Sequence, residues 1–195
     1  TSAFEVYHSR QMLILLLMAF SSGLPFELSG ELLRTWMTKA GIDIGLVGLA
    51  GLVAIPYTWK FVWSPLMDRY VPPFLGRRRG WMIICQLGVA AGAAAVAVSN
   101  PVEELRWVLG AAFFVAFCSA SQDIVIDAYR AELLSRRALG AGAGIAQLGY
   151  RFGMITSGGL ALILADRMPW RDVYLIMAAL MAVGPVTLAA DAPAP

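Results

Sequence analysis

Long apolar runs alternate with short polar connections along almost the whole chain. A helix needs about 20 predominantly apolar residues to cross the hydrocarbon core of a bilayer. Six segments reach that length, at residues 11–33, 44–67, 81–99, 107–128, 138–165 and 173–190. Because Gly23 and Pro25 interrupt the first run, we expect its helix to break at residues 23–25. The pattern predicts an all-α membrane protein with six transmembrane helices and no soluble domain.

The overall composition supports this class of protein. Hydrophobic residues make up 59% of the chain and charged residues 14%, with a mean hydropathy of +0.69. A net charge of +2 gives no reason to expect a nucleic-acid partner. Cys85 and Cys118 both lie in apolar runs, and His8 is the single histidine, so we expect no metal site and no cofactor.

The basic residues of the connections predict the orientation of the spans. With the N-terminus inside the cell, eight arginines fall on the cytoplasmic side and five basic residues on the other. The first group is Arg10, Arg69, Arg77, Arg78, Arg79, Arg130, Arg136 and Arg137, and the second is Arg34, Lys39, Arg106, Arg167 and Arg171. An excess of Lys and Arg marks cytoplasmic loops, which predicts a cytoplasmic N-terminus.

Charged residues lie within or at the ends of the apolar runs themselves, among them Lys60, Asp123, Asp127 and Arg151. An ionised side chain in hydrocarbon costs at least a few kcal/mol, unless it faces a polar cavity or pairs with an opposite charge. This placement predicts a hydrophilic path through the bundle and favours a transporter.

The connection between the second and third runs carries the motif SPLMDR at 64–69, followed by GRRR at 76–79. It resembles the G-x-x-x-D-R-x-G-R-R loop signature of the major facilitator superfamily, with Ser64 in place of the first glycine and a longer insert. The resemblance implies a charge network at the cytoplasmic helix ends that steadies one alternating-access state. Its members here are Asp68, Arg69, Arg77 and Arg78, together with Asp127 and Arg130 at the end of the fourth span.

Four further stretches resemble the AmpG-type muropeptide permeases of that superfamily. They read FSSGLP at 20–25, PYTWKFVWSP at 56–65, SQDIVIDAYR at 121–130 and LGYRFG at 148–153. The resemblance implies proton-coupled import of anhydro-muropeptides, which are anionic sugar-peptides, across the bacterial inner membrane. Related carriers handle siderophores or acetyl-CoA, so the cargo stays open. The family has two six-helix halves, and residues 1–195 match the N-terminal one. The missing C-terminal half and membrane lipids are thus expected partners, and residues 191–195 are expected to begin a linker.

Asp123 and Lys60 are the predicted proton-coupling residues. Counted along their helices, Asp123 lies about 10 Å and Lys60 about 12 Å from the cytoplasmic side, so they can pair. Burial favours a protonated carboxyl, as a proton carrier needs, whereas the neighbouring ammonium opposes it. A purely structural ion pair is the alternative. Asp127 lies nearer the interface, where it is expected to pair with Arg69 or Arg130.

Arg151 is the main predicted cargo residue. It lies about 20 Å into the fifth span, past the midplane, where its planar guanidinium suits a carboxylate. Gln147, Tyr150 and Gln122 are expected to add hydrogen bonds to the substrate. The alternative is an internal ion pair between Arg151 and Glu27 of the first span, a residue also counted among the substrate-binding candidates.

Two other kinds of protein compete with a transporter. A membrane enzyme could use Asp123 and Asp127 as a catalytic pair, although the sequence shows no nucleophile motif, and we expect no enzymatic activity. A non-transporting assembly or sensor subunit is the second rival. Glycines spaced four apart, at 88 and 92, 140 and 144, and 149 and 153, predict tight helix packing.

Overall fold

The computed structural model describes residues 10–73, 76–136 and 138–190, and every regular element within them is a helix. The predicted linker at 191–195 and Arg137 lie outside these residues. The first predicted span corresponds to α2 (Arg10–Ser29) and α3 (Glu31–Lys39). The second corresponds to α4 (Ile44–Leu49), η1 (Ala50–Ala54), α5 (Ile55–Trp59), η2 (Lys60–Val62) and α6 (Ser64–Arg69). The third and fourth are α7 (Arg77–Ala97) and α8 (Leu105–Leu133). The fifth comprises α9 (Leu139–Ile155), η3 (Thr156–Leu160) and α10 (Ala161–Ala165), and the sixth α11 (Trp170–Leu180) and α12 (Val183–Ala190).

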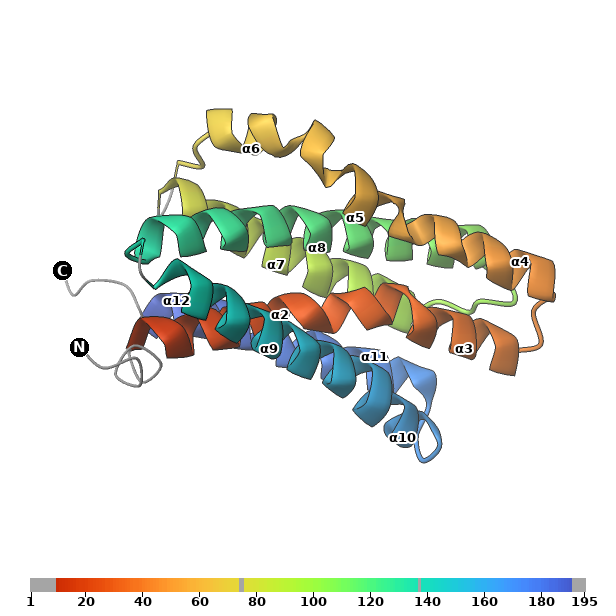
Figure 1. The fold of residues 1–195 in the computed structure, drawn as a ribbon. Helices are drawn as coiled ribbons and strands as arrows, with labels where there is room; N and C mark the ends of the chain where they lie inside the picture. The colour runs from red at the N-terminus through yellow and green to blue at the C-terminus, as the bar shows by residue number, and fades with distance from the viewer. Residues whose placement is uncertain (1–9, 74–75, 137, 191–195) are drawn as a thin grey trace.

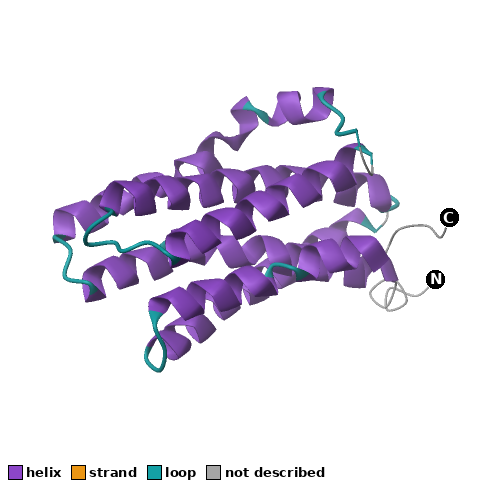
Figure 2. Ribbon diagram, turned by 180° about the vertical axis from the view of Figure 1, so that it is seen from behind, coloured by secondary structure: helices purple, strands orange, loops and turns teal. Residues whose placement is uncertain are grey.

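These helices run side by side along one direction as a bundle (Figures 1 and 2). We call the end at which α2 begins the terminal end, and the end at which α3 meets α4 the distal end. Five stretches of the described residues are long and apolar enough to cross a membrane, and they correspond to the first five predicted spans. They are Arg10–Lys39, Ile44–Val62, Arg77–Ala97, Leu105–Leu133 and Leu139–Ala165.

The expected break of the first helix at residues 23–25 is wrong, because α2 continues through Pro25 to Ser29. Proline leaves the carbonyl four residues earlier without its helical partner, but a membrane helix tolerates this where neighbours supply replacement contacts. The interruption falls instead at Gly30, between α2 and α3.

Gly23 permits close helix packing rather than a break. A Cβ at Gly23 would overlap the backbone carbonyl of Tyr150 on α9, and Cβ atoms at Gly149 and Gly153 would overlap the carbonyls of Leu16 and Phe20 on α2. The backbones of α2 and α9 therefore approach as closely as small residues allow.

The other two glycine pairs behave differently from each other. Gly88 and Gly92 pack tightly against α8, where added Cβ atoms would meet the side chains of Cys118 and Val115. Nothing lies within 4 Å of a Cβ at Gly140 or Gly144, so the tight packing predicted there is absent from the described chain. Those two glycines lie on a face of α9 that is open in this structure.

The second span is divided into short helical segments by its prolines. Pro56 lies in the first turn of α5 and Pro65 in the first turn of α6, positions at which the missing N–H is tolerated. The 3₁₀ helices η1 and η2 join these segments. Figure 1 shows this chain of short helices along one edge of the bundle, beside α8.

The sixth span is also interrupted, at residues 181–182, so neither α11 nor α12 alone has the length of a span. Pro185 cannot donate to the carbonyl of Met181, which a continuous helix would require. That carbonyl accepts a hydrogen bond of 3.0 Å from the Ser21 hydroxyl on α2. The Gln86 side chain of α7 donates in turn to Ser21 Oγ, at 2.6 Å.

The buried residues form two apolar clusters with a polar layer between them. One cluster fills the distal half of the bundle and includes Leu24, Val89 and Met177, whereas the other fills the terminal half. Buried polar side chains separate the two, among them Ser22, Gln86, Ser119 and Gln122. Polar groups in a dry interior are costly unless they line a cavity or form hydrogen bonds, so a functional site is expected within this layer.

An ion pair and a group of aromatic rings join two connections at the distal end. Lys39 Nζ lies 2.8 Å from Asp166 Oδ1 and 5.8 Å from the centre of the Trp170 ring. The rings of Trp36 and Trp170 stack with centroids 6.0 Å apart. These contacts connect the end of α3 to the beginning of α11.

We expect Asp166→Asn to remove a small, acid-sensitive contribution to stability. The hydrogen bond and charge of Lys39 lower the pKa of Asp166, which lies outside the spans. A carboxyl with a lowered pKa stabilises the folded state above its unfolded pKa of about 3.9, and this stabilisation is lost as the pH falls through the folded value. Thermal unfolding across a pH series should therefore show a small difference between variant and parent at pH 7 that disappears in acid. A difference that is constant with pH would contradict this role.

Candidate functional site

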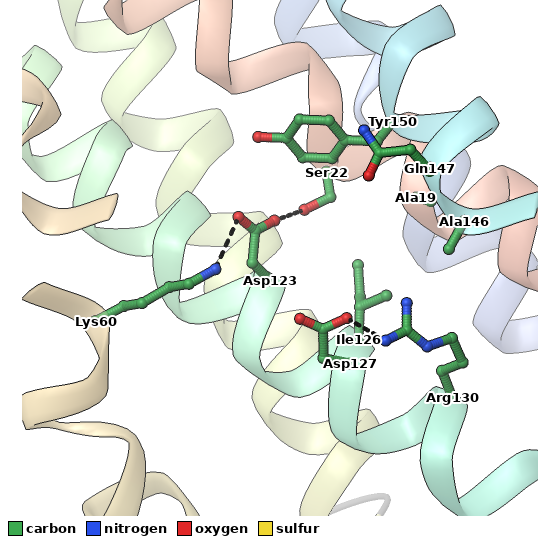
Figure 3. A pocket seen from close by; sticks show the side chains of 10 residues that line it. All are labelled: Ala19, Ser22, Lys60, Asp123, Ile126, Asp127, Arg130, Ala146, Gln147 and Tyr150. Atoms are coloured by element: carbon green, nitrogen blue, oxygen red, sulfur yellow. Dashed lines mark hydrogen bonds and ion pairs between the residues drawn. The ribbon is translucent and has the colours of Figure 1, made fainter. Parts of the chain in front are cut away.

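A cavity of about 230 Å³ opens within the polar layer, toward the terminal half of the bundle. Four elements line it: α2, η2, α8 and α9 (Figure 3). The lining side chains are Ala19, Ser22, Lys60, Asp123, Ile126, Asp127, Arg130, Ala146, Gln147 and Tyr150. The first, fourth and fifth spans form most of its walls, and the second span contributes Lys60.

Asp123 is the central charged group of the cavity. Its side chain is 13% exposed, and it accepts a hydrogen bond from the Ser22 hydroxyl on α2. Lys60 Nζ lies 3.7 Å from the other carboxylate oxygen, at the range of an ion pair rather than of a short hydrogen bond. The structure thus brings together the two predicted proton-coupling residues, and Figure 3 shows Lys60 reaching Asp123 from the opposite wall to Ser22.

A second ion pair lies on the terminal side of Asp123. Asp127 Oδ1 is 3.1 Å from Arg130 Nη2, within the last turns of α8 (Figure 3). Asp127 therefore pairs with Arg130, one of its two predicted partners. Its side chain is 58% exposed, in contrast to the enclosed carboxylate of Asp123.

The fifth span contributes Gln147 and Tyr150 to the cavity, but not Arg151. Successive residues of a helix are turned by about 100°, and the Arg151 side chain lies on the exposed face of α9. Within the described residues it makes no ion pair. The cavity therefore contains two of the three substrate-binding residues predicted on this span.

The alternative ion pair between Arg151 and Glu27 is wrong. The Glu27 side chain lies beside Gly158 of η3. Gly158 is seven residues further along the fifth span than Arg151, which is about 10 Å along the axis. No ion pair joins Arg151 to Glu27 among the described residues.

Gln122 also lies elsewhere than predicted. It is buried against Gln86 and Gly184, on a face of α8 that is turned away from the cavity. Its side-chain oxygen has no hydrogen-bond partner among the described residues. Adjacent residues of a helix cannot share a face, so Gln122 and Asp123 serve different surroundings.

Tyr150, which lines the cavity, belongs to a row of three aromatic rings. The Phe26 ring lies 5.0 Å from that of Tyr57 and 6.3 Å from that of Tyr150, measured between centroids. Phe26 follows Ser22 by one turn, and Tyr57 precedes Lys60 by one turn. Sequence reasoning missed Ser22, Phe26 and Tyr57, although Ser22 and Tyr57 fall in motifs that carried the family resemblance and Phe26 directly follows one of them.

Three of the six residues predicted for the loop network, Asp68, Arg77 and Arg78, are in contact at the terminal end, together with Glu132. Arg78 contacts Asp68 at 2.6 Å and Glu132 at 2.9 Å, and Arg77 contacts the same glutamate at 3.5 Å. Glu132, at the end of α8, was not predicted, although a carboxylate at that helix end faces the basic connection. Arg69 is exposed and has no ion-pair partner in the part of the chain that the structure describes.

Comparison with known proteins agrees with this architecture. A sequence model of the Major Facilitator Superfamily matches residues 12–195. The chain is 48% identical over 178 residues to the anhydromuropeptide permease of Escherichia coli strain K12, covering 91% of this chain and 36% of that protein. It is 42% identical to an uncharacterized protein of Haemophilus influenzae, covering 90% and 41%. It is 32% identical to putative transporter AmpG 3 of Rickettsia typhi, covering 94% and 45%.

These matches confirm the resemblance seen in the motifs of the sequence. The chain spans less than half the length of the curated relatives named here. Its fold is that of the N-terminal half of the larger architecture. From the family match and the membrane-length helices, we conclude that the chain belongs to the Major Facilitator Superfamily.

Proposed function

We propose that the chain is half of a proton-coupled permease that imports anhydromuropeptides, and that it is a carrier rather than an enzyme. The 48% identity to a protein named anhydromuropeptide permease supports this cargo. The observation that carries the proposal is the enclosed Asp123 carboxylate, held between Ser22 and Lys60 within a cavity of four spans. A titratable group at such a place has the chemistry of a proton carrier.

The coupling step follows from this geometry. Without a proton, Asp123 attracts Lys60 across the cavity and holds η2 near α8. A proton on Asp123 neutralises the carboxylate, so that the attraction between the second and fourth spans is lost. Because the two protonation states favour different separations of these spans, proton binding shifts the population between the states of alternating access. A purely structural ion pair remains the alternative role.

We further propose that the terminal end faces the cytoplasm, across a bacterial inner membrane. Arg10, Arg69, Arg77, Arg78 and Arg130 all lie at that end, as the positive-inside rule favours. The Asp68–Arg78–Glu132 network then connects the cytoplasmic ends of α6, α7 and α8. Such a network stabilises the conformation in which those helix ends are in contact.

Uptake by proteoliposomes tests the function. The complete gene product should accumulate radiolabelled anhydromuropeptide when the inside is alkaline, and unlabelled acetyl-CoA or siderophore should not compete. Competition by either of those compounds favours the related carriers, and substrate turnover without flux favours a membrane enzyme. Absence of both flux and turnover favours an assembly or sensor subunit.

Residues 1–195 alone should not transport unless they dimerise. The polar side chains of the cavity need a facing protein surface, because unsatisfied polar groups are costly in lipid. We expect uptake at the level of empty vesicles for the isolated piece and robust uptake for the complete protein in the same assay. Robust uptake by a demonstrated monomer of the piece would overturn the proposal that it is half of a carrier.

We propose that Arg151 binds a carboxylate of the cargo from the exposed face of α9. Arg151→Lys should weaken binding of an acidic muropeptide even though the charge remains, since a guanidinium forms paired hydrogen bonds that an ammonium cannot, and Arg151→Gln should weaken it further, by about tenfold or more. Because Arg151 has no ion-pair partner within the described residues, expression and thermal stability should be unchanged.

Binding of the muropeptide and of its amidated analogue, measured by calorimetry, provides the check on Arg151. The parent protein should prefer the acid, and the Arg151→Gln variant should not distinguish the two ligands. Equal binding of both ligands by the parent would exclude recognition of a carboxylate. Leu148→Ala, an exposed change one turn away on the same helix, is the matched control.

A further inference from the structure

A second cavity, of about 260 Å³, lies between α6, α7 and α8, on the other side of the second span from Asp123. Apolar side chains dominate its walls, including Leu66, Ile84, Cys85, Phe117 and Cys118. Figure 1 shows α6 at the edge of the bundle, so this cavity lies at the flank of the helices. The proposed transport function makes no use of it.

The indole N–H groups of Trp63 and Trp81 and the hydroxyl of Ser121, in the walls of this cavity, are already hydrogen-bonded. Trp63 Nε1 donates to the Ser121 hydroxyl at 3.0 Å, and that hydroxyl donates to the Phe117 carbonyl at 2.8 Å. Trp81 Nε1 donates to the Tyr70 carbonyl at 2.9 Å. The cavity therefore offers little to a polar cargo, and a space of this kind is poorly suited to water. The apolar walls of this cavity favour a hydrocarbon chain as its ligand.

Positive charge surrounds the terminal mouth of the cavity. Arg69 directly precedes Tyr70, and Arg77 lies one turn before Trp81, so both arginines adjoin lining residues. Arg78 follows on the same helix end, and the carboxylates that pair with these arginines among the described residues are Asp68 and Glu132. Arg69, Arg77 and Arg78 against these two carboxylates leave one positive charge in excess. Arg69 is exposed and makes no ion pair with any described residue.

We propose that this cavity binds one acyl chain of an anionic phospholipid, whose phosphate contacts Arg69 and Arg77. Tyr70 and Trp81 lie between the two parts of the lipid, at the depth where aromatic side chains gather in membrane proteins. Basic residues beside a cavity between spans provide the complementary charge for such a headgroup. The bound lipid connects α6 to α7 and α8 at the end of the bundle that carries the charge network.

Photo-crosslinking in the complete gene product tests the proposal. Vesicles contain phosphatidylglycerol, or phosphatidylcholine, with the same diazirine-bearing acyl chain, and labelled residues are mapped by mass spectrometry. Leu66 and Ile84 should be labelled about fivefold more by the anionic lipid, which is the effect expected for one basic contact at a membrane surface. Leu87 of α7 and Ile176 of α11, exposed apolar residues outside the cavity, should be labelled equally by both lipids.

Three variants distinguish specific lipid binding in this cavity from nonspecific contact with the bilayer. The double change Arg69→Gln with Arg77→Gln should abolish the preference for the anionic lipid, whereas Arg136→Gln, an exposed arginine of the α8–α9 connection, should preserve it. Ile84→Trp fills the cavity without changing any charge and should remove labelling of Leu66. Equal labelling by the two lipids, or labelling of Leu66 unaffected by Ile84→Trp, would overturn the proposal. Cross-links from these residues to another protein segment would overturn it too.

Discussion

Asp123→Asn is expected to abolish accumulation driven by a pH gradient. A gradient of one pH unit supports about tenfold accumulation for each proton carried with the cargo. Asparagine keeps the size of the side chain but cannot bind and release a proton, so the accumulation ratio should fall to one. Binding and exchange of unlabelled for labelled cargo should survive, because Ser22 and Lys60 remain in place. Proteoliposomes of the complete protein should be assayed both for accumulation driven by a pH gradient and for exchange of labelled cargo.

Asp127→Asn is the matched control for this change. Asp127 lies one turn further along α8 and lines the same cavity, but it is exposed and paired with Arg130. We expect its variant to keep gradient-driven accumulation within about twofold of the parent, since an exposed pair contributes about 1 kcal/mol or less. If Asp123→Asn accumulated cargo as the parent does, the residue would be structural and its pairing with Lys60 would be its whole role.

Gly23→Ala and Gly153→Ala should each destabilise the bundle strongly. A methyl group at either position would overlap a backbone carbonyl, of Tyr150 in one case and of Phe20 in the other. Backbone atoms cannot rotate away as a flexible side chain can, so α2 and α9 must separate. Overpacking of this kind costs about 1–3 kcal/mol per site. Thermal unfolding in detergent should show the loss, together with lower expression.

The same substitution on the open face of α9 provides the comparison. Gly140→Ala and Gly144→Ala place the methyl group where nothing lies within 4 Å. Alanine favours a helix over glycine by about 1 kcal/mol, so these variants should be as stable as the parent or slightly more stable. If all four variants lost stability equally, the loss would come from glycine content in general rather than from the contact between α2 and α9.

Much of the fold could be predicted because apolar length and loop charge are local properties of the sequence. The approximate positions of five membrane-length helical stretches followed from runs of apolar residues, whereas their ends differ by up to six residues from those expected. The breaks were harder to place, because the effect of a proline depends on partners distant in the chain. Pro25 is accommodated within α2, whereas Pro185 accompanies a real interruption of the sixth span. Residue spacing alone does not distinguish these two cases.

The site was predictable where depth along a single helix decided the outcome. Counting residues from the helix ends brought Lys60 and Asp123 to one level, and they are in contact. Counting failed for Arg151 and Glu27, because their relative height depends on how α2 and α9 pack against each other. The prediction for Gln122 was wrong because the rotation of α8 about its own axis turns this side chain away from the cavity. A sequence motif does not show which face of a helix each residue occupies. Helix register and rotation are tertiary properties.

The hydrogen bond from Ser21 to the Met181 carbonyl has a consequence for the order of assembly in the cell. Its two residues are 160 positions apart, so the donor is synthesised long before the acceptor. The segments α11 and α12 are each too short to cross the bilayer alone, and the Met181 carbonyl between them accepts hydrogen bonds from both the Ser21 hydroxyl of the first span and the backbone N–H of Gly184. We therefore expect the last span to reach its final position only after α2 is correctly inserted. The bundle is therefore complete only in molecules whose first helix has been inserted correctly.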